Sequence, residues 1–145
     1  MPKLPRANRS AWDAPYRATR YRVYLPTTTE DIRIGHPAPA VDAWMDEHAS
    51  GTATVITACN PHSRQHSRAA NRRAQCALLH LLHAMPHPML PGRNLADAGD
   101  WPPEHSLIVA GLSRGEARRL AARFRQNAVV WLSRGSRARL LWVRR

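Results

Sequence analysis

The run SLIVAGL at residues 106–112 places the strongest constraint on the fold, because nearly all of its side chains are apolar. A strand of this composition is buried on both of its faces. Helical patterns flank it at residues 67–85 and 113–126, where apolar residues recur every three or four positions. The run therefore predicts a strand inside a sheet against which helices pack.

From residue 51 onward, strand and helix patterns alternate in the order β-α-(β)-β-α-β-β. Strands are expected at residues 51–59, 127–132 and 138–144, while Pro and Gly make 86–105 a long loop or a ragged strand near Met89 and Leu90. Before residue 51, strands are expected at 20–26 and 32–35 and a helix at 40–49. The order predicts an α+β fold with a ferredoxin-like, split β-α-β topology and helices on one face of a mixed sheet.

Two serines precede the longer helical patterns and are expected to begin those helices. Ser67 is a candidate N-cap. Ser113 with Glu116 three positions later forms a capping box. The length of 145 residues predicts a single domain at 19–145. Residues 1–18 carry three prolines and no visible periodicity, so we expect a flexible basic arm with Trp12 and Tyr16 as docking points.

The net charge of +12 favours a polyanion as partner, and RNA first among polyanions. Lys3 is the only lysine, and Arg, Ala, Pro and His are all abundant, as in proteins from GC-rich genomes. The charge therefore reports either function or codon usage. The leading prediction is a non-catalytic, RNA-binding domain. The alternatives are a small enzyme or ligand-binding domain, and a protein-interaction module for an acidic partner.

Targeting signals are missing from the sequence. No apolar run approaches the roughly 18 residues of a membrane-spanning helix, and the N-terminus has no apolar h-region. Cys59 and Cys76 do not make a disulfide framework and are expected to be reduced and partly buried. We expect a cytoplasmic protein that has no membrane partner.

Three segments together resemble a known family: ITACNPHS with a later Ser and Asn (56–71), WPPEHSLIVAGL (101–112) and FRQNAVVW (124–131). They are similar to the bacterial family catalogued as Domain of Unknown Function 3293, over about residues 19–143. Members have no established activity, so the resemblance implies the fold and the choice of polar positions but no mechanism. Cys59 and Ala70 depart from the family pattern, which is often aromatic at the first position and commonly acidic at the second.

Five polar residues lie at expected strand ends or in the first turns of helices, where an open α/β sheet has its crevice. We predict that they bind a ligand through amide groups, with Glu104 as the candidate general base. The alternative is structural, with Asn60 bracing a turn and Asn127 in the left-handed conformation at a helix C-cap. The set is Asn60, Asn71, Glu104, Gln126 and Asn127.

Arginines recur at helical spacing beside the same region. Guanidinium groups make bidentate contacts with phosphate, and helix N-termini bind anions. We therefore predict an anion site in the loop CNPHSRQHS (59–67), with the arginines closing over it. The alternative is a solvated helical face. The predicted nucleic-acid-binding residues are Arg64, Arg68, Arg72, Arg114 and Arg118.

A cysteine and two histidines are spaced to share one helical face. Cys76, His80 and His83 stand at i, i+4 and i+7, and thiolate with imidazole suits zinc. Leucines crowd the same helix, and the spacing matches no zinc ribbon or finger. The prediction is no metal site and no cofactor.

Overall fold

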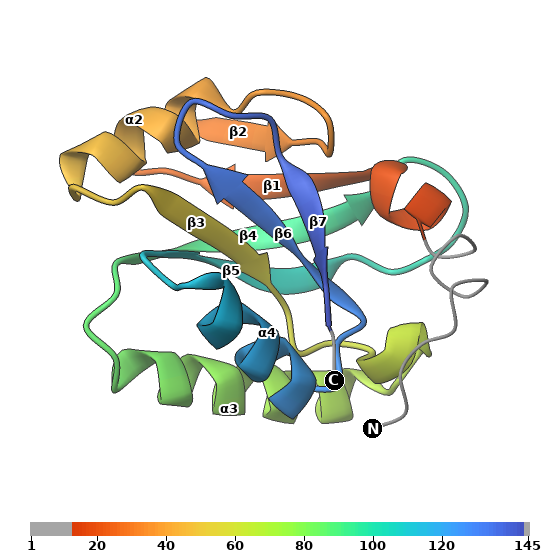
Figure 1. The fold of residues 1–145 in the computed structure, drawn as a ribbon. Helices are drawn as coiled ribbons and strands as arrows, with labels where there is room; N and C mark the ends of the chain where they lie inside the picture. The colour runs from red at the N-terminus through yellow and green to blue at the C-terminus, as the bar shows by residue number, and fades with distance from the viewer. Residues whose placement is uncertain (1–12, 144–145) are drawn as a thin grey trace.

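The computed structural model describes residues 13–143. Figure 1 shows one strongly curled sheet, and its seven strands run in the order β2-β1-β4-β5-β3-β6-β7. Each strand pairs antiparallel with its neighbours, so the expected mixed sheet is wrong. In chain order the elements are β1 (Thr19–Tyr24), β2 (Thr29–Ile32), α2 (Pro39–Glu47), β3 (Thr52–Ile56), the 3-10 turn η1 (Pro61–Ser63), α3 (Arg68–His83), β4 (Met89–Ala96), β5 (Glu104–Ala110), α4 (Arg114–Arg123), β6 (Ala128–Ser133) and β7 (Arg139–Trp142).

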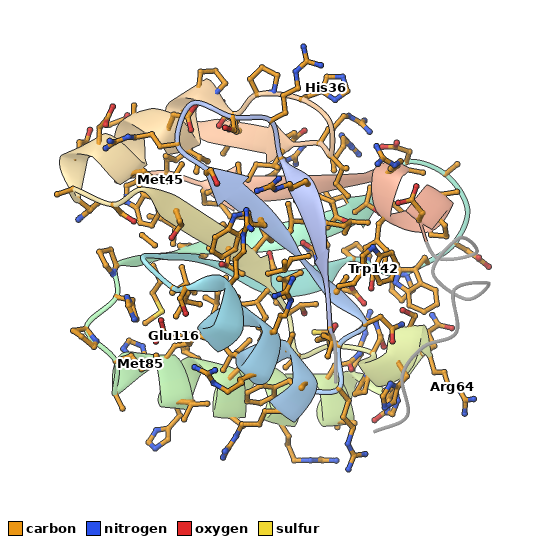
Figure 2. The ribbon with its side chains drawn as sticks, in the orientation of Figure 1. His36, Met45, Arg64, Met85, Glu116 and Trp142 are labelled. Carbon is orange, nitrogen blue, oxygen red and sulfur yellow. The ribbon has the colours of Figure 1, made fainter. Side chains whose placement is uncertain are left out.

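The sheet separates two apolar cores. On one face, α3 and α4 bury Leu78 and Leu120 against the odd-numbered side chains of β5, such as Leu107. On the other face, α2 buries Trp44 and Met45, and Figure 2 shows Met45 directed from α2 toward the sheet. The prediction that the helices share one face thus holds for α3 and α4 and is wrong for α2. The long apolar strand is buried on both sides because it lies between these two cores.

Strand β4 occupies residues that were expected to be a loop or a ragged strand. It pairs with β1 on one side and β5 on the other. Its Gly92 lies where the sheet is most crowded, because a Cβ there would come within 2.7 Å of the Arg22 carbonyl oxygen, Ile108 Cδ1 and Ser106 Oγ. The turn-forming residues Pro91 and Gly92 therefore stand inside a strand whose pairing and close packing require the glycine.

Helices α3 and α4 begin directly after Ser67 and Ser113, the two serines that were expected to cap them. Ser67 Oγ accepts a hydrogen bond from the amide of Ala70, and Ser113 forms a reciprocal capping box with Glu116. Helix α2 has no side-chain cap of its own. Glu30 from β2 supplies one, because its two carboxylate oxygens accept the amides of Ala40 and Val41 at 2.9 and 3.0 Å.

Part of the predicted N-terminal arm is folded onto the sheet. Residues 13–17 are helical, and Tyr16 packs against the core on the α2 face. Trp12 and the rest of residues 1–12 lie outside the described part of the chain. Across residues 13–143, no helix is long and apolar enough to cross a bilayer.

Candidate functional site

A cavity of about 370 Å³ opens on the face of the sheet that also carries α2. Val55 and Val130 form part of its floor and belong to the α2-side core. Pro15, Tyr16, Ala18, Thr19 and the loop containing Trp101 complete its wall. The cavity thus lies between the sheet and the helical segment at residues 13–17, which Figure 1 shows just before the start of β1.

A row of three polar side chains crosses the sheet at this end. Tyr21 of β1 pairs with Asn94 of β4, and Asn94 pairs with Glu104 of β5. Paired residues in adjacent antiparallel strands project to the same face. All three line the cavity. Antiparallel pairing therefore gathers residues that lie far apart in the sequence.

Asn60 connects this row to the loop that follows β3. Its Nδ2 donates to Glu104 Oε2 at 2.7 Å, and its Oδ1 accepts from Asn71 Nδ2 and from the His66 amide, both at 2.9 Å. Its own amide donates to Asn71 Oδ1 at 2.8 Å. Asn60 adopts the left-handed conformation, with φ of 49°, which asparagine tolerates better than most residues. Asn60, Asn71 and Glu104 thus form one network, in which Asn60 braces the loop and also holds the carboxyl group.

Glu104 is the acidic centre of the cavity. Burial raises the pKa of this carboxyl group, and hydrogen bonds with Asn60, Trp101 and Asn94 lower it by less. The Trp101 indole Nε1 approaches Glu104 Oε2 at 3.4 Å. A partly desolvated carboxyl with a raised pKa can donate a proton when neutral and accept one when ionised.

Two tyrosines form the wall nearest β1. Burial raises the pKa of Tyr16 to about 12, and the pKa of Tyr21 is also raised by burial. The Tyr21 hydroxyl donates to the Tyr16 carbonyl oxygen at 3.0 Å. The Tyr16 ring meets Trp142 edge-on, with ring centroids 5.7 Å apart. Both phenols are therefore neutral at physiological pH and offer aromatic surface and dipoles.

Gln126 and Asn127 approach the same loop from the opposite side. Gln126 lines the cavity, and its Nε2 donates to the carbonyl oxygens of Cys59 and Phe124. Asn127 Nδ2 donates to Ser63 Oγ at 2.9 Å, and Asn127 is not among the cavity-lining residues. The expectation of a left-handed Asn127 is wrong, because Arg125 takes that conformation after α4, with φ of 56°. Both amides thus attach the loop that follows β3 to the segment that precedes β6.

Four of the five predicted arginines lie on α3 and α4, and Arg64 lies in the loop before α3. Helix α3 begins at Arg68, so Arg64 is not on a helical face with Arg68 and Arg72, and Figure 2 shows Arg64 pointing outward from its loop. On α4, the Arg114 guanidinium lies 5.8 Å from the Trp131 ring centroid, and Arg118 Nε donates to the Trp142 carbonyl oxygen at 3.3 Å. None of the five predicted arginines lines the cavity.

Sequence reasoning did not identify Asn94, Trp101 or Tyr21 as site residues. Asn94 stood in the presumed loop, Trp101 stood beside two prolines, and Tyr21 was part of an ordinary strand pattern. Cys59 is buried as expected, and Cys76 is exposed, which corrects the expectation for that thiol. Within residues 13–143, no group of three or more His, Cys, Asp or Glu side chains is arranged to hold a metal ion.

The comparison with family models matches residues 56–129 to a family described as a protein of unknown function, DUF3293. No curated protein and no solved structure matches the chain. The matched span contains Asn60, Asn71, Glu104, Gln126 and Asn127, together with the helical layer. Since the match covers just over half of the 145 residues, this chain belongs to the DUF3293 family.

Proposed function

We propose that this domain binds a small molecule in the cavity and that Glu104 exchanges a proton or a hydrogen bond with it. The observation that carries the proposal is a carboxyl group, its pKa raised by burial, in the wall of a cavity that is mostly apolar. A concave apolar site with a few converging polar groups is the usual form of a ligand pocket. Titratable groups with perturbed pKa values concentrate at such sites.

The surroundings of Glu104 suit a group that reacts or binds. Hydrogen bonds orient its carboxyl group, and no cationic side chain among the described lining residues pairs with its charge. Asn60, Trp101 and Asn94 direct hydrogen bonds to the carboxyl, while no Arg, Lys or His is among the described residues that line the cavity. A carboxylate has about four acceptor positions. Capacity therefore remains for a ligand, and the fixed amides keep the carboxyl in one place.

A fragment screen by ¹H–¹⁵N correlation spectroscopy tests the proposal. We expect fragments that bind to shift the Trp101 indole signal and the amides of Asn60, Asn94 and Glu104 together. Ala96→Phe, which fills the cavity from the end of β4, should remove these shifts. Ala43→Phe, at an exposed position on α2, is the matched control and should keep them. Fragment shifts scattered over other surfaces, and unchanged by Ala96→Phe, would refute the proposal.

We also infer that residues 52–133 form a ferredoxin-like unit. Their elements run β3-α3-β4-β5-α4-β6, with β5 between β3 and β4 in the sheet and β3 between β5 and β6. This order supports two interleaved, split β-α-β connections. Strands β1 and β2 then extend one edge of the unit, and β7 extends the other.

A second function, polyanion binding, has its own supporting observation in the helical layer. Seven arginines and one acid, Glu116, stand in α3 and α4, and no acid lies between Glu47 and Asp97. The Glu116 carboxylate caps α4. Arg68, Arg72 and Arg119 are exposed. Such a surface fits the phosphate backbone of single-stranded RNA, whose binding depends on charge.

Charge reversal on α3 tests RNA binding by this layer. We expect Arg68→Glu with Arg72→Glu to weaken binding of a fluorescein-labelled single-stranded RNA at least tenfold and to reduce the salt slope, because phosphate contacts are lost. The matched control is Arg134→Glu with Arg137→Glu in the β6–β7 turn, which changes the net charge equally. Equal losses in both variants, measured by fluorescence anisotropy, would mean that only net charge matters.

A further inference from the structure

Among the residues that the structure describes, none that lines the cavity carries a positive charge, although the protein is strongly basic. The chain has a net charge of +12, yet the described residues that line the cavity include no Arg, Lys or His, and Glu104 is the one that carries a charge. Seven of the arginines lie on α3 and α4, on the opposite face of the sheet. We propose, resting on the ligand-binding function above, that the cavity takes a small organic cation, a protonated amine or amidine.

Two acceptors stand side by side in the cavity wall. Asn94 is only 9% exposed, it is paired with Glu104 across β4 and β5, and its Oδ1 has no hydrogen-bond partner. Buried polar atoms rarely stay unpaired, and leaving one unpaired is costly. The Glu104 carboxylate adds acceptor positions at the next strand. The ionised Glu104 carboxylate accepts hydrogen bonds from the N–H groups of a ligand and repels an anion. Asn94 Oδ1, which has less than 1 Å² of its own surface exposed, adds a second acceptor only when its side chain turns toward the ligand.

The remaining walls suit the rest of such a ligand. Tyr16, Tyr21 and Trp101 present aromatic rings, which attract cations through their negative faces. Alanine and valine side chains supply apolar contact for a hydrocarbon or ring body. Trp101 is 40% exposed at the cavity wall, so a bound ligand would gain buried area by covering its ring.

Three probes of nearly identical shape separate the ligand classes: benzamidine, benzamide and benzoate, which are a cation, a neutral amide and an anion. We expect benzamidine to bind in the cavity at pH 7.5 at least tenfold more tightly than benzamide, and benzoate to bind more weakly than both. Binding is read from the Trp101 indole and Asn94 side-chain signals. Glu104→Gln should bring benzamidine down to the affinity of benzamide, while Glu47→Gln, an exposed carboxylate on α2, should change nothing.

The outcomes distinguish this proposal from the one it rests on. If benzamide or benzoate binds in the cavity as tightly as benzamidine, the cavity is a ligand site but the cation preference is wrong. If benzamidine binds and Glu104→Gln has no effect, the cation is not recognised by Glu104, and the proposal is overturned. If none of the three probes shifts cavity signals, the cation proposal fails, and the ligand-binding proposal is left to the fragment screen.

Discussion

Asn60→Ala is expected to lower the free energy of unfolding by about 3 kcal/mol, because several costs fall on one residue. The substitution removes the 2.7 Å hydrogen bond to Glu104 and leaves Asn71 Nδ2 and the His66 amide without their acceptor. Hydrogen bonds to charged groups contribute about 1.5–3 kcal/mol. Alanine in the left-handed conformation costs about 1 kcal/mol more. The melting temperature should fall by on the order of 10 °C.

Urea denaturation of matched variants checks the origin of this loss. Asn127→Ala removes another buried amide, whose side chain makes one hydrogen bond, to Ser63, and should cost about 1 kcal/mol. Asn60→Gly relieves the left-handed strain but not the lost bonds, so it should recover about 1 kcal/mol of the alanine loss. A loss at Asn60 no greater than that at Asn127 would show that the network does not hold the loop.

The local elements could be predicted because their signals are local. The caps Ser67 and Ser113 lie where the helices begin, and the periodic pattern at 67–85 became α3 at Arg68–His83. Strand β4 could not be predicted in the same way, because Pro91 and Gly92 oppose a strand locally and only pairing with β1 and β5 makes one. Tertiary pairing here overrides propensity.

The candidate site was predicted in part for a related reason. Asn60, Asn71 and Glu104 were grouped because strand ends meet, and they are hydrogen-bonded together. Asn94 and Tyr21 join them through register across three strands, and register depends on the whole sheet. The anion site predicted in loop 59–67 remains a prediction, although Asn60 and Asn71 bond to each other and to Glu104 instead of presenting open amides.

The second large effect is expected at Glu104, where a neutral side chain of the same shape should make the fold more stable as pH rises above 4.5. Burial raises the pKa of Glu104 above its ordinary value of 4.5, so the folded state holds this proton more tightly than the unfolded chain does. The resulting stability is complete below pH 4.5 and is lost as pH rises through the folded-state pKa. A folded-state pKa that is higher by one corresponds to about 1.4 kcal/mol of unfolding free energy.

Glu104→Gln removes this loss, because glutamine stays neutral at every pH and its oxygen still accepts the hydrogen bond from Asn60. If the protein unfolds more easily with Glu104 than with glutamine at this position, Glu104 is kept for function. Binding sites commonly give up stability for reactivity. A residue kept for structure would behave in the opposite way.

The most direct test of the central claim is therefore the free energy of unfolding of the native chain and of Glu104→Gln, measured by urea denaturation from pH 4 to pH 8. The account predicts near-equal stability at pH 4 and an advantage for Glu104→Gln that grows with pH, while Glu47→Gln, an exposed carboxylate, follows the native chain throughout. If Glu104→Gln is instead less stable by the same amount at every pH, Glu104 is a structural partner of Asn60, and the cavity loses its claim to be a functional site.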